Sequence, residues 1–185
     1  MNIAIIGKGR VATHLARALF SAGHEVTMCG GRHRTQPVPA EAEVVILSVK
    51  DSAISQVAQT LADSKALVLH TSGSVPMDAI PSVRRGVFYP LQTFSLDRNV
   101  DFRKIPLFLE ARPEEDMALL AQLASDISDT HMPMDGERRK TLHLAAVLCC
   151  NFVNHLYSIS HDILAEQGIP FCTLFPLMEE TLDKV

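Results

Sequence analysis

The chain has 185 residues, of which 47% are hydrophobic, and a formal net charge of −4 at pH 7. This length fits one domain, or one domain with a smaller second one, and the apolar content excludes a disordered chain. The negative charge and the lack of a long basic run argue against partners such as nucleic acid or an anionic membrane surface.

The cysteines and the first residues bear on the cellular compartment. The spacing of Cys29, Cys149, Cys150 and Cys172 fits neither a zinc site nor a disulfide framework, which indicates reduced thiols. The adjacent Cys149 and Cys150 fall in a helical pattern, where we expect them as small buried side chains. The initial MNIAIIG has no basic segment ahead of its short apolar run, unlike a signal peptide. We therefore expect a cytoplasmic protein.

Strand and helix patterns alternate along the first half of the chain. Apolar strands are predicted at 3–6, 25–29, 44–49, 66–69, 86–89 and 106–110. One helix follows the first strand and ends at Gly23, a second follows the third strand with Asp51 as its cap, and a third covers about 113–127. This alternation predicts an α/β fold, in which a Rossmann-type, doubly wound, mostly parallel sheet carries helices on both faces.

The pattern changes near Gly136, which predicts a nucleotide-binding domain at 1–134 and an all-helical C-terminal domain at 135–185. One helix is expected over about 137–167 and a helical stub at 176–185. Residues 141–161 carry no Asp, Glu, Lys or Arg, but their Asn and His side chains are costly in lipid, so we expect a buried helix and no membrane span. Because this helical part buries little core alone, we expect a second copy or further residues beyond Val185 to complete it.

A glycine-rich turn lies between the first strand and the first helix. Residues 3–12 read IAIIGKGRVA, which matches the strand, G-x-G-x-x-A, helix pattern of dinucleotide sites. Gly7 permits the tight turn, Gly9 lets the backbone approach a pyrophosphate, and Ala12 lets the helix pack closely on the strand. An ordinary tight turn is the alternative. The expected cofactor contacts in this segment are Gly7, Lys8, Gly9, Arg10 and Val11.

The second strand indicates which dinucleotide binds. NAD-binding proteins place an acidic residue near the end of this strand to hold the ribose 2′-hydroxyl, but no Asp or Glu occurs between Glu25 and Glu41. Arg32 and Arg34 can instead pair with a 2′-phosphate, and Thr35 can donate a further hydrogen bond. We therefore predict NADP as the cofactor, with an ordinary solvated basic loop as the alternative.

The third strand leads into a further cofactor segment. In a doubly wound sheet the carboxyl ends of the strands border the cofactor. Ser48 and Val49 are therefore expected beside the ribose and the nicotinamide, whereas Lys50 can face either phosphate or solvent.

Two polar segments after the fourth and fifth strands are candidates for substrate binding. The loop His70-Thr71-Ser72-Gly73-Ser74 can present N–H and O–H groups to an anion, and its candidate residues are His70, Ser72 and Gly73. After the fifth strand, Gln92 and Thr93 are the polar candidates. An ordinary turn with a packed histidine is the alternative.

The long helix has one apolar face and one polar face without charge. On a wheel of about 100° per residue, the polar face carries His143, Asn151, Asn154, Tyr157, Ser158 and His161. A face without Lys or Glu favours a cleft or an interface over open water. Three histidines spread over this length cannot meet one ion, so we expect no metal site. Asn154 is the candidate substrate contact on this face.

The chain resembles a known family in five segments: GKGRVATHLARAL, HTSGS, FYPLQTF, IPLFLEA and LHLAAVLCCNFVNHLY. This family comprises NADP-binding Rossmann-like oxidoreductases with a C-terminal helical domain of unknown function, related to pyrroline-5-carboxylate reductases and beta-hydroxyacid dehydrogenases. The resemblance implies an NADP domain, a dimerising helical domain and a chain longer than this one. The dehydrogenase relatives use a Lys and an Asn on the equivalent helix, where this chain has His143 with Asn151 or Asn154.

These features lead to one function hypothesis and two alternatives. We expect an NADPH-dependent oxidoreductase that reduces a small acid or imine, with His143 as the proton donor and Asn151 as the second catalytic residue. A non-catalytic NADP-binding sensor or dimerisation module is the first alternative, and a metal-binding histidine-rich helix is the weaker second. The expected partners are a small-molecule substrate and a second copy bound through the long helix, with no nucleic acid and no membrane.

Overall fold

The computed structural model describes residues 1–30 and 37–185 of the chain. They form two compact units, Met1–His143 and Leu144–Val185. The sequence pattern places the domain boundary at 134, ahead of the long helix. In the structure the first turns of that helix belong to the first unit, because Arg139 is buried there and Leu142 packs against apolar residues of that unit.

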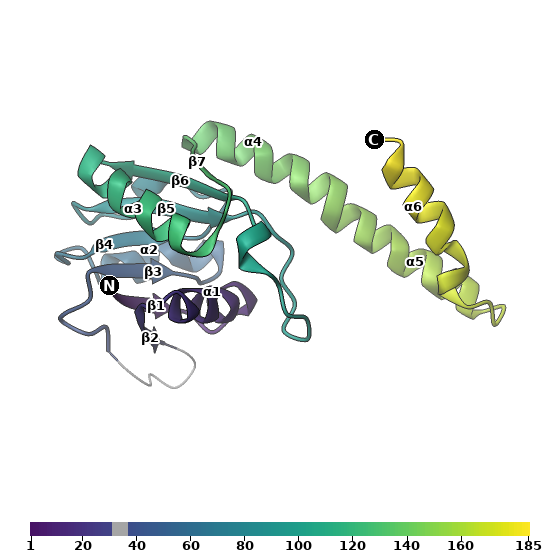
Figure 1. The fold of residues 1–185 in the computed structure, drawn as a ribbon, viewed down its shortest axis with the longest axis horizontal. Coiled ribbons are helices and arrows are strands. Elements are labelled where there is room, and N and C mark those ends of the chain that lie inside the picture. The colour runs from purple at the N-terminus through teal and green to yellow at the C-terminus, as the bar shows by residue number, and fades with distance from the viewer. Residues whose placement is uncertain (31–36) are drawn as a thin grey trace. The chain divides into compact units, whose positions relative to one another are not determined.

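The first unit is built on one seven-stranded sheet with the strand order β2-β1-β3-β4-β5-β6-β7 (Figure 1). Its strands are β1 (Asn2–Ile6), β2 (Glu25–Cys29), β3 (Val44–Leu47), β4 (Leu67–His70), β5 (Arg85–Pro90), β6 (Leu107–Arg112) and β7 (His131–Pro133). Neighbouring strands pair in parallel, except that β5 and β6 are antiparallel. The carboxyl ends of β1 to β5 therefore gather at one edge of the sheet. The predicted mostly parallel, Rossmann-type sheet is confirmed.

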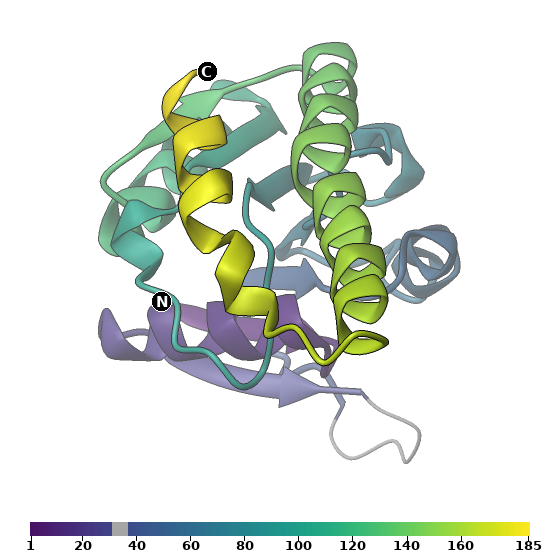
Figure 2. The same ribbon diagram turned by 90° about the vertical axis from the view of Figure 1, so that its right-hand side faces the viewer.

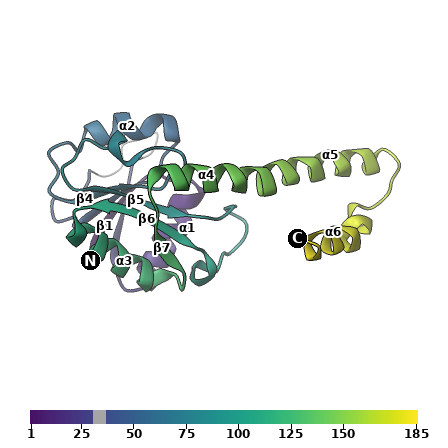
Figure 3. The ribbon, with the colours of Figure 1, turned by 90° about the horizontal axis from the view of Figure 1, so that it is seen from above.

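Helices cover both faces of this sheet, as Figure 3 shows. The helical segments of the first unit are α1 (Arg10–Ser21), α2 (Asp51–Gln59), η1 (Met77–Ala79), η2 (Phe102–Lys104), α3 (Glu114–Ile127) and the start of α4 (Gly136–Ala146). Leu15 of α1 and Leu123 of α3 join the larger apolar core on one face, whereas Ile54 of α2 belongs to a separate cluster on the other. Burying each such side chain contributes about 1.5–3 kcal/mol. Because both faces are covered, strands such as β3 are apolar at every position.

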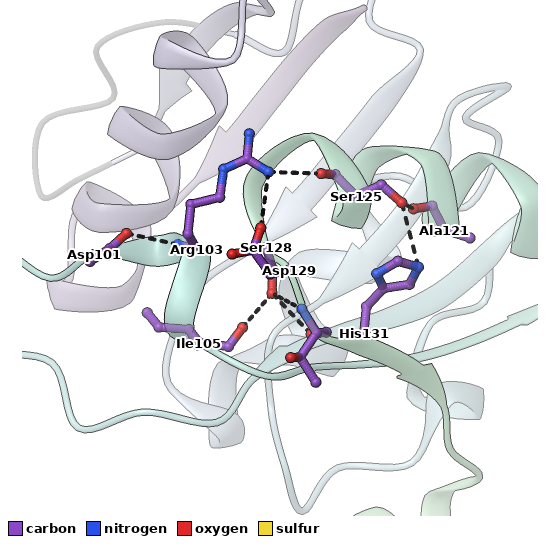
Figure 4. A network of polar contacts seen from close by, with 9 residues as sticks. Asp101, Arg103, Ile105, Ala121, Ser125, Ser128, Asp129 and His131 are labelled. Atoms are coloured by element: carbon purple, nitrogen blue, oxygen red, sulfur yellow. Dashed lines mark hydrogen bonds and ion pairs between the residues drawn. The ribbon is translucent and has the colours of Figure 1, made fainter.

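The edge strand β7 has no counterpart among the predicted strands. It has three residues and ends in a proline, so the sequence carries no strand periodicity there. A polar network between α3 and β7 holds it in place (Figure 4). The hydroxyl of Ser128 lies 2.6 Å from the carbonyl oxygen of Ile105 and accepts from the amide of Thr130 at 3.1 Å. Arg103 donates to the carbonyl of Ser125 at 3.1 Å, which ties the same end of α3 to η2.

The start of α4 is held by a buried arginine. Arg139 is 1% exposed, and its guanidinium pairs with the carboxylate of Glu110 on β6. The same guanidinium donates to the carbonyl of Val75 at 2.7 Å. Residues four apart lie on the same side of a helix, so Arg139 also fixes the position of His143 one turn later.

The second unit contains the rest of the long helix and a short helical return. Its segments are the π-helical turn η3 (Val147–Phe152), α5 (Val153–Ala165), η4 (Phe171–Leu174) and α6 (Phe175–Asp183). The chain reverses direction between α5 and α6, as Figure 2 shows. Phe171 packs against both α5 and α6, because its ring centroid lies 5.6 Å from that of His161 and 5.9 Å from that of Phe175.

The π-helical turn changes the expected register of the long helix. The helix is continuous over Gly136–Ala165, but η3 has the i→i+5 pattern and therefore more residues per turn than an α-helix. A helical wheel drawn at about 100° per residue therefore does not predict which side chains share a face across such a turn. The prediction that Asn151 and Asn154 share one face with His143 therefore loses its geometric basis.

The expectation that the long helix is buried is wrong for this chain. Leu148, Leu156 and Ile163 are 55%, 58% and 61% exposed, and both Cys149 and Cys150 are exposed thiols instead of buried ones. The physical reason is the size of the second unit, whose short helical return covers little of the helix. By length and composition alone the helix Gly136–Ala165 could cross a membrane, a criterion that core helices of soluble proteins also meet.

We predict that Arg139→Ala lowers the free energy of unfolding by about 3 kcal/mol, because it leaves the largely buried Glu110 carboxylate without its partner. The double variant R139M/E110L, which replaces the pair by apolar side chains, should recover most of this loss. The exposed pair of Arg85 and Asp78 provides the control, since Arg85→Ala should cost at most about 1 kcal/mol. Denaturant unfolding measures all three, and a cost for Arg139→Ala no larger than that of the control would contradict the prediction.

Candidate functional site

The glycine-rich turn connects β1 to α1 and touches the end of β3. Gly7 has a φ of 141°, and a Cβ built on it would lie 2.1 Å from the carbonyl oxygen of Ser48. The amide of Ser48 donates to the carbonyl of Ile6 at 2.9 Å, so the two strand ends are tied together at this point. Any side chain at position 7 would therefore collide with the backbone of Ser48, which explains why glycine occupies this position.

Gly9 is a glycine for a different reason. Its φ is −76°, which any residue adopts, and a Cβ built on it meets nothing within 4 Å. Gly9 is the N-cap of α1, and the first turn of this helix carries no acidic residue and no side-chain cap. Among residues 1–30 and 37–185 no side chain caps this helix start, which carries the N–H groups of the first turn and the positive end of the helix dipole. This is the cradle that a pyrophosphate requires, and a side chain at Gly9 would fill it.

The predicted residues around this turn lie where the motif requires. Lys8 and Arg10 are exposed beside it, and Val11 is half-buried at the start of α1. Three other predicted cofactor contacts, Arg32, Arg34 and Thr35, lie outside the described residues.

The end of β3 forms the next part of the same edge. Ser48 is buried, Val49 is half-buried and Lys50 is exposed. The prediction that Asp51 caps α2 is wrong, because Lys50 is the N-cap and Asp51 is the first helical residue. The carboxylate of Asp51 instead accepts a hydrogen bond of 2.7 Å from the hydroxyl of Ser74, which ties α2 to the loop after β4.

The loop after β4 is shaped by two residues that were expected to bind substrate. His70 is 0% exposed, and its Nδ1 accepts from the amide of Ser72 at 3.1 Å. The hydroxyl of Ser72 is an acceptor for the amides of Ser74 and Val75, each at 3.1 Å. Nδ1 of His70 and the hydroxyl of Ser72 therefore support the loop's own conformation, while Nε2 of His70 is buried with no hydrogen-bond partner among the described residues. Substrate contacts by His70 and Ser72 remain predictions.

His70 is also held neutral. Burial of the imidazole, with a smaller contribution from the nearby Arg139 guanidinium, lowers the pKa of His70 to about 4, while the Pro76 carbonyl and the Asp51 carboxylate partly oppose this shift. A neutral imidazole that accepts at Nδ1 carries its proton on Nε2. His70 is thus unsuited to donate protons to a ligand.

His143 reaches this loop from α4. A Cβ built on Gly73 would lie 2.6 Å from Cγ of His143 and 2.8 Å from its Cβ, so only a glycine permits the imidazole to lie there. The hydroxyl of Tyr89 on β5 lies 2.9 Å from Nδ1 of His143, and the two rings meet edge to face at 5.8 Å. Tyr89 is 7% exposed, and burial raises its pKa to about 12, against a smaller lowering by the Arg139 guanidinium. The side chain of His143 is therefore fixed on two sides.

The other predicted site residues are not brought together by described contacts. Gln92 and Thr93 are exposed, and the amide oxygen of Gln92 accepts from the amide of Thr93 at 2.8 Å. Asn151 and Asn154 are exposed in the second unit. Their proposed roles remain predictions.

Contacts link the glycine-rich turn to His143 without interruption. Gly7 touches Ser48, the hydroxyls of Ser48 and Thr71 lie 3.5 Å apart, and the same loop carries Gly73 beneath His143. The nucleotide cradle and the imidazole thus belong to one continuous edge of the sheet, which is where ligands bind in doubly wound folds. Two surface cavities, of about 420 and 770 Å³, lie elsewhere, one lined by Arg17 and Arg103 and the other by Glu43 and Lys65.

Tyr89 and Arg139 were missed by the sequence reasoning. Tyr89 lies in the segment FYPLQTF, in which only the more polar Gln92 and Thr93 were singled out. Arg139 lies in the run Glu-Arg-Arg-Lys, which resembles the solvated start of a helix. Residues 1–30 and 37–185 contain no group of three or more His, Cys, Asp or Glu that could hold a metal ion.

We predict that His70 makes the protein less stable in acid. Its folded-state pKa lies below the value of about 6.5 for an exposed histidine, so protonation favours the unfolded chain. The free energy of unfolding should fall by up to about 3 kcal/mol as the pH drops from 6.5 toward 4. His70→Asn, which keeps an acceptor for Ser72, should remove this part of the pH dependence, whereas replacing the exposed His161 by Asn should not. If the free energy of unfolding depends on pH in the same way in the wild type and in His70→Asn, His70 is not the origin of the loss of stability in acid.

Comparisons with known proteins agree with this architecture. The family model described as "Domain of unknown function (DUF2520)" matches residues 105–185. The chain is 39% identical to a Bacteroides fragilis protein named "putative NADP oxidoreductase", with 100% of this chain and 80% of that chain covered and a TM-score of 0.90. A comparison with curated proteins finds no match.

Two more distant structures share the fold alone. A Thermotoga maritima protein is 22% identical with a TM-score of 0.69, over 99% of this chain and 79% of that one. A 1-pyrroline-5-carboxylate reductase from Streptococcus pyogenes is 15% identical with a TM-score of 0.72, over 98% of this chain and 76% of that one. The resemblance noted in the sequence is confirmed by the 39% identity over the whole chain. The chain therefore belongs to the same Rossmann-type family as the Bacteroides fragilis protein named "putative NADP oxidoreductase", and its C-terminal part matches the DUF2520 model.

Proposed function

We propose that this protein is an NADPH-dependent reductase that acts on a carbon–oxygen or carbon–nitrogen double bond of a small molecule. The observation that carries the proposal is the position of His143, which lies on Gly73 at the edge that also forms the Gly7–Gly9 cradle. A nucleotide cradle and a fixed imidazole on one continuous edge are what a hydride-transfer reaction with a proton donor requires.

The cofactor would be held at the start of α1. The amides after Gly9 would receive the pyrophosphate, since this helix end is open and free of acidic residues. Ser48 and Val49 would border the ribose next to the nicotinamide. The sequence between Glu25 and Glu41 favours NADP over NAD, because it offers Arg32 and Arg34 and no acid.

His143 would supply the proton. Reduction adds a hydride to carbon and a proton to the heteroatom, and NADPH supplies the hydride when it is bound. His143 donates the proton from Nε2 to the oxygen or nitrogen of the substrate and regains one from solvent. Roles for Asn151 and Asn154 in catalysis or substrate binding remain predictions from the sequence.

A non-catalytic NADP sensor is the second candidate. It is favoured by His143, which stands on the helix where the dehydrogenase relatives carry a lysine. The two candidates differ in one property, which is turnover of NADPH in the presence of a carbonyl or imine compound.

We also propose that a second copy of the chain covers the exposed apolar side chains of the long helix, and that the protein is cytoplasmic. The exposed residues include Leu144, Leu148, Phe152, Leu156 and Ile163. Their burial against an identical helix would be favourable, and His and Asn on the same helix make lipid a poor alternative.

The cofactor proposal predicts that Gly9→Ala weakens NADPH binding without unfolding the protein. Alanine can adopt the backbone conformation of Gly9, so the free energy of unfolding should fall by only about 1 kcal/mol. The added methyl group would occupy the cradle. NADPH affinity, measured by fluorescence titration, should fall by more than about tenfold.

The same titration measures cofactor preference. Wild type should bind NADPH more tightly than NADH, and Arg32→Ala should weaken NADPH more than NADH. Arg112→Ala is the control, because Arg112 is exposed at the opposite edge of the sheet. Equal affinities for the two cofactors in the wild type would contradict the NADP assignment.

The catalytic proposal predicts that His143→Gln lowers kcat by about 10²–10⁴-fold. The affinity for NADPH should change little, because His143 lies beyond the phosphate cradle. NADPH oxidation against a panel of oxo acids and cyclic imines measures the effect, and His155→Gln is the matched control on the same helix. Turnover of His143→Gln at the wild-type rate would remove His143 from the mechanism, and tight NADPH binding without any turnover would favour the sensor.

A further inference from the structure

We propose that Tyr89 is a positioning residue that fixes the imidazole of His143 as a hydrogen-bond donor at Nε2. The site would then select substrates that present an unprotonated acceptor, such as a carbonyl oxygen or a neutral imine nitrogen, over protonated iminium ions. The substrate preference rests on the proposed reductase function, whereas the state of the imidazole does not.

The direction of the hydrogen bond between Tyr89 and His143 follows from the acceptors that are available to the Tyr89 hydroxyl. The phenolic oxygen lies 2.9 Å from Nδ1, and either atom could carry the proton. Among the described residues, Tyr89 has no other hydrogen-bond acceptor for its hydroxyl. If Nδ1 carried the proton, the hydroxyl of this buried residue would lose its only acceptor, at a cost of about 1–3 kcal/mol. Tyr89 therefore donates and Nδ1 accepts.

Tyr89 retains its proton over the working range of an enzyme. Burial raises the pKa of Tyr89 to about 12, an effect that the Asp51 carboxylate reinforces and the Arg139 guanidinium partly offsets. A neutral imidazole that accepts at Nδ1 has its hydrogen on Nε2. A protonated imidazole has hydrogens on both nitrogens. Nε2 is thus a donor in both protonation states of His143.

The packing of the ring directs this donor away from the loop. The atoms of His143 nearest to a Cβ built on Gly73 are Cγ, Nδ1 and Cβ, at 2.6 to 2.8 Å. These atoms form the side of the ring next to the helix backbone, so Nε2 lies on the far side of the imidazole. The edge-to-face contact with Tyr89 restricts rotation of the ring.

A permanent donor at this position discriminates between substrates. A carbonyl oxygen or a neutral imine nitrogen can accept a hydrogen bond from Nε2 in either protonation state. The protonated imidazole then transfers its Nε2 proton as the hydride arrives at carbon, which leaves a neutral ring that regains a proton from solvent. A protonated iminium nitrogen carries its own hydrogen and would face Nε2–H donor to donor. An N-alkylated iminium ion has no lone pair on nitrogen to accept, and its reduction needs no proton.

The protonation of His143 can be measured without any cofactor or turnover. In protein labelled with ¹⁵N-histidine, at a pH where His143 is neutral, the Nε2 resonance should have the shift of a protonated nitrogen and Nδ1 that of an unprotonated one. Comparison with His143→Gln assigns the signals. A protonated Nδ1 in the neutral wild-type imidazole would overturn the proposal.

Tyr89→Phe tests the role of the hydroxyl with little change in shape. Without its donor, Nδ1 should move toward the protonated shift as the other tautomer becomes populated. Phe108→Leu is the control, because Phe108 packs against the Tyr89 ring at 6.3 Å and carries no hydroxyl. An unchanged Nδ1 resonance in Tyr89→Phe, or an equal change in Phe108→Leu, would remove Tyr89 from this role.

Substrate preference is measured separately, by NADPH oxidation with ring-matched compounds. We expect kcat/KM for a cyclic ketone or neutral imine to exceed that for the N-methylated iminium ion of the same ring by more than about tenfold. The reverse order would overturn the preference. If the nitrogen shifts are as expected and none of the compounds is reduced, the reductase proposal and its substrate preference fall together, while the assignment of Tyr89 stands.

Discussion

The ion pair between Arg139 and Glu110 is the contact on which the candidate site depends. A guanidinium that is 1% exposed has lost its hydration, and it is compensated by one carboxylate and by the carbonyl of Val75. Such a pair adds little net stability over an apolar contact, but breaking it is expensive, so it strongly favours one position of the helix over others. That position brings His143, one turn further, over Gly73 and against Tyr89.

The same buried charge influences the titratable groups around it. The Arg139 guanidinium lowers the pKa of both His70 and Tyr89, and the Asp51 carboxylate acts in the opposite direction on both. In each case burial is the larger cause, and it keeps the side chain neutral. At this edge of the sheet His70 supports the loop, and His143 is a half-buried imidazole held between Gly73 and Tyr89.

The parts of this arrangement that depend on local sequence were predictable. The turn at Gly7 and Gly9, the strand before it and the helix after it follow from periodicity and from the conformational needs of one glycine, and they are where the pattern places them. His143 and Gly73 were also recognised as candidates, each from its own segment. What the sequence could not indicate is that the two touch, because 70 positions of chain and a sheet topology with an antiparallel strand separate them.

The differences between the sequence expectations and the structure have physical causes as well. Nδ1 of His70 and the hydroxyl of Ser72 form hydrogen bonds within their own loop, which the sequence does not reveal. Arg139 resembles a surface residue until Glu110, from another strand, supplies its partner. The ideal helical wheel fails at η3, since a π-helical turn leaves no periodicity that distinguishes it from an α-helix.

The central claim is that His143 and the glycine-rich turn serve one reaction. A crystal structure of the protein with NADP bound tests it most directly. We predict that the pyrophosphate lies over Gly9 and that the nicotinamide points toward the loop at 70–74. Between its C4 atom and Nε2 of His143 there should be room for one small substrate, with reacting atoms about 3–3.5 Å apart. A nicotinamide directed away from this loop, with His143 out of reach of any substrate at C4, would contradict the account.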